Sequence, residues 1–368
     1  MLPYFLLLFL SVVIPLFCYQ PAKNTFCYSA IDIIRKRNKL TIVLFFVGFF
    51  ALLSLRDIAV GIDIKTYKEF SKICHSTSWT KLSALSWEMG YTLYNKFLTT
   101  IYNNYRFFLI VTAAVILIPI YKLYSKEKRY CVLLILLFIN MPCFLMIFSG
   151  LRQAIATSIG VWAYMALDDK KYALSVALVS LACCFHISAI VLLLIYPAYF
   201  LKIKTRYLLY VVPILIAIFV FRYPIFSLIL NSVPSKYLMF YGKIEQTGAF
   251  GMLILFGLFL VFSFVILDET HMSDKDYFMR NMLLISTAFQ IFVPVHGLIQ
   301  RASYYFLIFV PVSIVSIVQA PKKKMKNVAD VAIVVMGVFF FLYFFYNAAF
   351  SKDNLLNVFP YKFFWSGQ

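Results

Sequence analysis

Charged residues are scarce in this sequence. They make up 13% of its 368 residues, whereas 63% are hydrophobic and 19% are aromatic. A soluble domain needs roughly 25% charged residues, so this composition excludes a soluble globular protein. A chain in lipid must satisfy its backbone hydrogen bonds internally. The sequence therefore predicts an all-α integral membrane protein whose main partner is the lipid bilayer.

Acidic residues are scarcer still, with 15 Asp and Glu against 34 Lys and Arg. A basic surplus of this size often indicates nucleic-acid binding. Here, however, the basic residues lie in short connections between apolar runs and form no single patch. This distribution is how a membrane protein fixes its orientation, so we expect no nucleic acid among the partners.

Motifs for metals and nucleotides are absent as well. The seven cysteines show no CxxC or Cys/His ligand spacing, and there is no HExxH and no pair of histidines four residues apart. A glycine-rich phosphate loop of the Walker type is also missing. We therefore expect no metal and no cofactor. The N-terminal run lacks the basic region and the cleavage site of a signal peptide, and we interpret it as the first span.

The apolar runs predict about twelve transmembrane helices in one membrane domain, residues 1–368, because each crossing needs about 20 residues. The predicted spans are 2–19, 40–55, 106–124, 130–148, 150–167, 172–185, 187–201, 207–222, 251–267, 281–296, 298–319 and 327–346.

Two longer hydrophilic stretches, 56–105 and 223–250, are predicted to be outward loops. More than half of the Lys and Arg residues fall in six short connections: 20–39, 121–130, 168–171, 202–206, 268–280 and 320–326. By the positive-inside rule these connections lie on the inner side, with both termini outside.

The remaining polar residues gather at the outward ends of the predicted spans in this orientation. They are Arg56, Asp57, Asp63, Tyr67, Glu88, Arg152, Gln153, His186, His296 and Arg301. An ionisable group at membrane depth costs a few kcal/mol and is a functional candidate by default. Arg152 is the clearest case, because 130–167 holds no other charge.

The residue types suit a lipid diphosphate. The planar fork of arginine pairs with two phosphate oxygens at once, so we predict that Arg152 and Arg301 bind the diphosphate. A carboxylate or a histidine is needed where an acceptor hydroxyl loses its proton. Asp63, Glu88 and His186 are the candidate bases, and Glu88 is preferred narrowly over His186.

Structural roles remain open alternatives for single residues. Arg56 and Asp57 also fit an ion pair at a helix end. His186 taken alone fits a core histidine with satisfied hydrogen bonds, and Arg301 fits an arginine that extends to the membrane interface.

The order of these residues resembles the EpsG-like, Wzy-type polysaccharide polymerases over about residues 50–310. The motifs that carry the similarity are RD and GxDxxxY at 56–67, ExGY at 88–91, FSGLRQAIA at 148–156, FHISAI at 185–190 and QRASYYF at 300–306.

This resemblance implies a GT-C-like glycosyltransferase with many spans. The implied activity is polymerisation of O-antigen or exopolysaccharide repeat units on undecaprenyl diphosphate, at the periplasmic face of the bacterial inner membrane. A chain-length regulator is an implied further partner. The residues implied to bind the diphosphate or the glycan are Arg56, Asp57, Tyr67, Arg152, Gln153, Arg301 and Tyr305.

Two other functions remain as alternatives. A dozen spans is also typical of transporters, including flippases for lipid-linked glycans, although these place polar groups at the midplane between internal repeats. An O-antigen ligase would use the same donor on the same side of the membrane and would differ in its acceptor.

Overall fold

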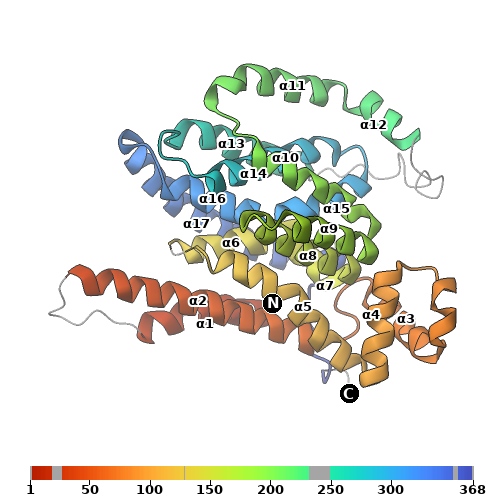
Figure 1. The fold of residues 1–368 in the computed structure, drawn as a ribbon. Coiled ribbons are helices and arrows are strands. Elements are labelled where there is room, and N and C mark those ends of the chain that lie inside the picture. Colours follow the sequence, from red (N-terminus) through yellow and green to blue (C-terminus); the bar gives the residue numbers. More distant parts are fainter. Residues whose placement is uncertain (1, 19–26, 128, 232–248, 351–354, 367–368) are drawn as a thin grey trace. The chain divides into compact units, whose positions relative to one another are not determined.

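The computed structural model describes residues 2–18, 27–127, 129–231, 249–350 and 355–366. Every regular element in these ranges is a helix (Figure 1). Two isolated β-bridges, Arg56 with Phe363 and Leu267 with Pro321, are the extended pairings within the described part. The prediction of an all-α protein is thus confirmed.

The chain divides into two compact units. Unit 1 comprises Met1–Ile190 and Val335–Gln368, and unit 2 comprises Val191–Val334. Each unit has its own helical core, and each is described below by itself.

In unit 1, helices follow one another as packed neighbours: α1 packs on α2, α2 on α5, α5 on α8, and α8 on α9. Two further helices, α3 and α4, pack together, and α4 also contacts α9. The elements are α1 (Leu2–Cys18), α2 (Cys27–Leu55), α3 (Ile64–Ser76), η1 (Trp79–Ala84), α4 (Met89–Ile101), α5 (Tyr105–Tyr124), α6 (Cys131–Asn140), α7 (Pro142–Ser149), α8 (Leu151–Asp168) and α9 (Tyr172–Phe185).

The C-terminal segment, residues 355–366 with the short turn η6 (Leu355–Asn357), fastens the loop that precedes α3. The amides of Gly61 and Ile62 donate to Asn357 and Leu356, and the amide of Asp57 donates to the carbonyl of Lys362. Gly61 has φ +101°, a conformation that favours glycine. The start of α3 is therefore held by the far end of the chain.

In unit 2, α14 is the central helix and contacts α10, α11, α13, α15 and α16. The elements of this part of the chain are η2 (Ile187–Leu194), α10 (Ile195–Phe200), η3 (Thr205–Tyr207), α11 (Leu208–Val220), α12 (Arg222–Asn231), α13 (Ala249–Ile266), α14 (Asp274–Phe292), α15 (Gly297–Leu307), α16 (Val310–Gln319), η5 (Lys323–Met325) and α17 (Lys326–Phe350). Both η2 and α17 continue from one unit into the other.

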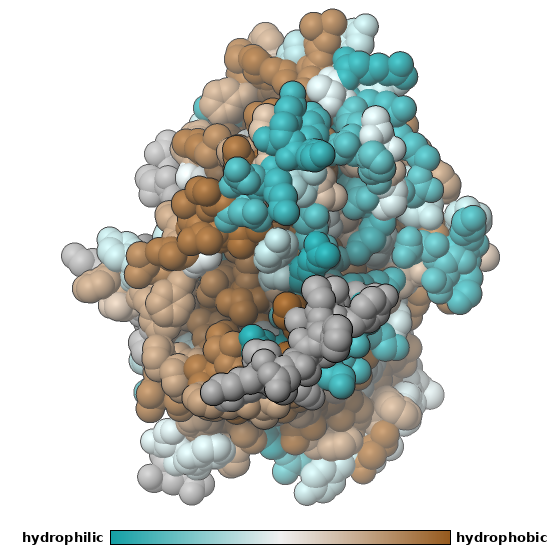
Figure 2. Space-filling view, turned by 90° about the vertical axis from the view of Figure 1, so that its left-hand side faces the viewer, coloured by the Kyte–Doolittle hydropathy of each residue, from teal (hydrophilic) through white to brown (hydrophobic). Residues whose placement is uncertain are grey.

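Three helices in the described part are long and apolar enough to cross a membrane, or six spans if each bent pair of helices counts as one. Four shorter apolar helices accompany them. Many hydrophobic side chains are exposed, as Figure 2 shows on one face, and only 17% of the apolar window of α17 is buried. These features agree with a membrane protein, and the count of twelve spans remains a prediction.

Several predicted spans coincide closely with helices, including 106–124 with α5 and 172–185 with α9. The predicted span 130–148 is instead two helices, α6 and α7, bent by 63° at Met141. Pro142 explains the bend, since proline has no amide hydrogen and disfavours the helical conformation in the residue before it.

The stretch 56–105, predicted as an outward loop between spans, contains α3, η1 and α4, and its position on the outer side stays a prediction. The helix α3 is amphipathic: Ile64, Tyr67, Phe70 and Cys74 share its buried face, and lysines occupy other positions. These lysines lower the hydrophobicity of the stretch, so it was not identified as helical. Residues 27–39 of the predicted loop 20–39 likewise extend α2. Of the predicted loop 223–250, the first part belongs to α12, and residues 232–248 lie outside the described residues.

Candidate active site

Glu88 stands at the N-cap position of α4, but its side chain does not cap that helix. The carboxylate instead bonds to α8 and to the end of α9. Gly90 permits this approach, because a Cβ atom there would come within 2.7 Å of the main-chain oxygen of Cys184 in α9. Absence of a side chain at residue 90 thus brings α4 against α9.

Arg152 lies in the first turn of α8, where it pairs with Glu88. Its Nη1 is 2.5 Å from Glu88 Oε2, and the two side chains are 24% and 20% exposed. The guanidinium also lies over the indole of Trp87, 4.4 Å from the ring centroid. One ion pair and one aromatic face therefore orient Arg152 while part of it remains open to solvent.

His186 ends α9 in an extended conformation. Its Nδ1 lies 3.1 Å from Glu88 Oε1, and the amide of Ile187 donates to the same oxygen at 3.4 Å. Among the described residues, no protein group bonds to Nε2 of His186. A histidine with Nδ1 held by a carboxylate presents Nε2 as its free nitrogen.

The charge of Glu88 is strongly favoured at this position. Burial acts to raise the pKa of its carboxyl group, but the hydrogen bond with His186 and the positive charge of Arg152 outweigh burial and lower the pKa to about 2. Glu88 is therefore ionised at neutral pH. A carboxylate this acidic is a poor proton acceptor. Orienting Arg152 and His186 is therefore a more suitable role for Glu88 than accepting a proton.

Trp87 is a site residue that the sequence analysis did not identify. Phe70 of α3 stacks on its indole at 4.0 Å, with the ring planes 20° apart, and Arg152 lies 4.4 Å from the same ring. Two groups this close to one ring cannot share a face, so the indole lies between them. The adjacent Glu88 was the available sequence signal, but aromatic residues are too common in membrane proteins to stand out.

Tyr67 is the one predicted binding residue of α3 that joins this cluster. Its ring packs edge-on against Trp87 at 5.3 Å. Burial raises the pKa of its hydroxyl group, and the charge of Arg152 opposes that shift. Asp63, at the N-cap position of α3, is half-buried and does not cap its helix. Gln153 is buried within α8, with 5% of its surface exposed.

Arg56 and Asp57 hold main-chain atoms in unit 1. Arg56 is 1% exposed, its guanidinium donates to the carbonyl of Phe148, and its own carbonyl accepts from Arg106 at 2.8 Å. Asp57 Oδ1 accepts from the amide of Ala59 at 2.9 Å. These bonds give both residues structural contacts to the main chain, and no ion pair joins the two among the residues that the structure describes.

Arg301 and Tyr305 belong to unit 2, in α15, where Arg301 is exposed and Tyr305 is fully buried. His296 is the N-cap residue of that helix, and its Nδ1 accepts from the amide of Leu298 at 3.1 Å. The structure thus assigns His296 a capping role. Of the ten predicted site residues, the structure brings together Glu88, Arg152, His186 and Tyr67.

A model of the EpsG family matches residues 39–363 of the chain. This match confirms the resemblance inferred from the motifs, and it covers Glu88, Arg152, His186 and most of the C-terminal segment. No curated protein and no solved structure matches the chain.

Proposed function

This chain belongs to the EpsG family, and from that premise we propose that it is a membrane glycosyltransferase that polymerises oligosaccharide repeat units carried on a lipid diphosphate. The donor is the growing glycan on one lipid diphosphate, and the acceptor is the non-reducing end of the next lipid-linked repeat. We take the lipid to be undecaprenyl diphosphate and the membrane to be a bacterial inner membrane from the resemblance to the polysaccharide polymerases, and the active face to be the periplasmic one from the positive-inside distribution.

One observation carries the proposal: a single carboxylate, Glu88, holds both an arginine and a histidine that come from two other helices. This transfer needs a group that binds the diphosphate and a group that takes the proton of the hydroxyl, and an arginine and a histidine suit these two tasks. Their common anchor fixes the distance between them.

In the proposed reaction, an acceptor hydroxyl attacks the anomeric carbon of the donor sugar. The new bond joins that carbon to the acceptor oxygen, and the bond from the carbon to the diphosphate oxygen breaks. The electron pair leaves with the lipid diphosphate, whose negative charge Arg152 stabilises. The proton of the hydroxyl passes to Nε2 of His186.

His186 is preferred over Glu88 as the base, which reverses the preference drawn from the sequence. Glu88 is ionised, paired with Arg152 and too acidic to hold a proton near neutral pH. His186 keeps Nε2 available while Glu88 holds Nδ1. A carboxylate that orients a catalytic imidazole in this manner is a recurrent arrangement in enzymes.

The test is deletion of the gene, followed by complementation and analysis of the surface glycan on a gel. We expect the deletion strain to expose lipid-linked single repeats outside the cell and the wild-type chain to restore long glycans. His186→Ala, at normal membrane levels, is expected to leave single repeats. His75→Ala is the matched control, because His75 is exposed in the same unit and should restore long glycans.

Other outcomes would favour the alternatives. Accumulation of single repeats on the inner side would indicate a flippase, whereas long glycans that stay on the lipid carrier would indicate a ligase. Long glycans with His186→Ala would overturn the assignment of the base.

A further inference from the structure

An apolar groove of about 520 Å³ runs through unit 2 between α11, α13 and α14. One face of α11, from Leu208 to Phe219, and one face of α13, from Leu253 to Val265, form its two long walls. Thr287 of α14 is the single polar residue in this lining. No residue of α11 is buried, so this helix lines the groove without packing tightly against its neighbours.

The length of the groove matches one leaflet of a bilayer. At a rise of 1.5 Å per residue, the wall on α13 is roughly 18 Å long, and half of the hydrocarbon core is about 15 Å thick. The groove therefore suits one hydrocarbon chain that enters from one side of the membrane.

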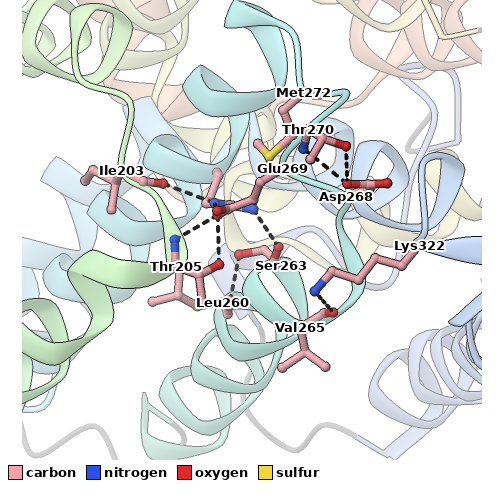
Figure 3. Close-up of polar contacts among 11 residues, drawn as sticks. Ile203, Thr205, Leu260, Ser263, Val265, Asp268, Glu269, Thr270, Met272 and Lys322 are labelled. Atoms are coloured by element: carbon pink, nitrogen blue, oxygen red, sulfur yellow. Dashed lines mark hydrogen bonds and ion pairs between the residues drawn. The ribbon is translucent and has the colours of Figure 1, made fainter. Parts of the chain in front are cut away.

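A polar cluster, whose contacts Figure 3 shows, lies beside one end of the groove, next to the lining residues Leu208 and Val265. The guanidinium of Arg280 donates to the carbonyl of Ile203 at 3.0 Å and to Glu269 Oε1 at 2.7 Å. Thr205 donates to the same oxygen from its amide and its hydroxyl group, each at 2.8 Å. These bonds fasten the segment before α11 to the segment after α13, so this end of the groove is fixed.

Basic residues flank the same end. Lys322 Nζ donates to the carbonyl of Val265, a lining residue, at 2.9 Å (Figure 3). Arg206 is exposed and precedes the lining residue Leu208 by two positions. The acids of the neighbouring segment bond to other groups: Glu269 to Arg280, Asp274 to Lys202 at 2.6 Å, and Asp268 to Thr270 at 2.7 Å and to His271 at 3.2 Å. Positive charge from Lys322 and Arg206 is therefore left to act on a ligand.

We propose that this groove binds one acyl chain of an anionic phospholipid, with the phosphate held by Arg206 and Lys322. The basic residues at one end of the groove complement the negative charge of the phosphate, and the apolar lining, about as long as one leaflet is thick, matches the acyl chain. The lipid would fill the space between α11 and α13 that packing leaves open.

The experiment uses the purified full-length chain in vesicles that contain phosphatidylglycerol with a photoactivatable acyl chain. We expect cross-links to peptides of α11 and α13, and competition by unlabelled phosphatidylglycerol but much less by phosphatidylcholine. Replacing both cations, in Arg206→Gln with Lys322→Gln, should lower the preference for the anionic lipid by about thirtyfold, since each of the two basic residues contributes about 1 kcal/mol near an anionic surface.

Two glycines of α13 give a matched pair of variants. A Cβ atom at either Gly257 or Gly251 meets no atom within 4 Å, but only Gly257 lines the groove. The leucine side chain in Gly257→Leu should occupy part of the groove and displace the acyl chain, so labelling should fall at least about fivefold because the lipid loses apolar contact. Gly251→Leu should leave labelling unchanged.

Equal labelling of wild-type and Gly257→Leu would overturn the proposal. So would equal competition by the two unlabelled lipids, or recovery of a polyprenyl phosphate instead of a phospholipid cross-linked to these peptides after extraction from native membranes.

Discussion

Each unit contains one buried or half-buried arginine paired with a glutamate, and the two pairs differ in what else the arginine binds. In unit 2, both terminal nitrogens of Arg280 bond to main-chain oxygens, those of Ile203 and Ser263, in addition to Glu269. In unit 1, Arg152 pairs with Glu88 and rests on an aromatic ring. The exposed fractions of the two arginine side chains are 1% and 24%.

This difference separates a structural arginine from a candidate binding arginine. Main-chain oxygens do not change their state during a reaction, so a guanidinium bound to them holds segments together. Arg56 follows the pattern of Arg280, because it is buried and donates to the carbonyl of Phe148. Arg152 retains surface through which a phosphate oxygen can reach it.

Arg280→Ala is expected to have the largest effect, and that effect is on stability. Removing one partner of a buried pair costs about 3–5 kcal/mol, so the amount of protein in the membrane and its thermal stability in detergent should fall sharply. Lys326→Ala, an exposed residue of the same unit, is the control and should behave like the wild-type chain. A stable Arg280→Ala protein would show that the cluster does not hold unit 2 together.

Arg152→Ala should instead remove activity and leave the protein in place. Loss of a group that stabilises a leaving charge lowers rates by about 10²–10³-fold. The measurement is the rate of glycan polymerisation per amount of protein in membranes. Arg129→Ala, an exposed arginine of unit 1, should retain the wild-type rate. If Arg152→Ala is active, the reaction does not need Arg152, and if the variant is lost from the membrane, Arg152 belongs to the structural class.

These two arginines also mark what sequence alone reveals. Arg152 stands out because no other charge occurs in 130–167, and charge in an apolar run is costly wherever it folds. Arg280 was assigned to an inner connection, and its burial was not foreseen. Its partners Ile203 and Ser263 are distant in sequence, and no local pattern reports a bond between a guanidinium and a distant carbonyl.

The same reasoning explains the rest of the fold and the site. Helices such as α5 and α9 follow from apolar runs, because lipid requires every backbone bond to be satisfied within the helix. The anchoring of the α3 loop by Lys362 and Asn357 joins opposite ends of the chain and has no local signal. Glu88, Arg152 and His186 were each identified as polar residues, but their common ion-pair network required the packing of α4 against α8 and α9.

Glu88→Gln tests whether the carboxylate orients its partners through its charge. Glutamine can still form a hydrogen bond to one partner, but it has no negative charge. A hydrogen bond to a charged group contributes about 1.5–3 kcal/mol, so the rate should fall roughly tenfold to a hundredfold. Glu269→Gln is the matched change in unit 2 and should lower stability while the rate per folded protein is kept.

The pair of changes also has an internal check. Because Glu88 and Arg152 are in contact, the effects of Glu88→Gln and Arg152→Ala should be less than additive when they are combined. Full additivity would mean that the two side chains act independently, and Glu88 would then not be the residue that orients Arg152.

Trp87→Leu should have the smallest effect, because the indole positions Arg152 and takes no part in bond making in the proposed reaction. A cation–π contact contributes about 0.5–2 kcal/mol, so the expected loss is about tenfold, expressed mainly as weaker donor binding in kinetics with vesicle-reconstituted protein. Trp87→Phe keeps an aromatic face under the guanidinium and should recover most of the activity. If Phe is as harmful as Leu, the aromatic face is not what matters, and the indole itself contacts the glycan.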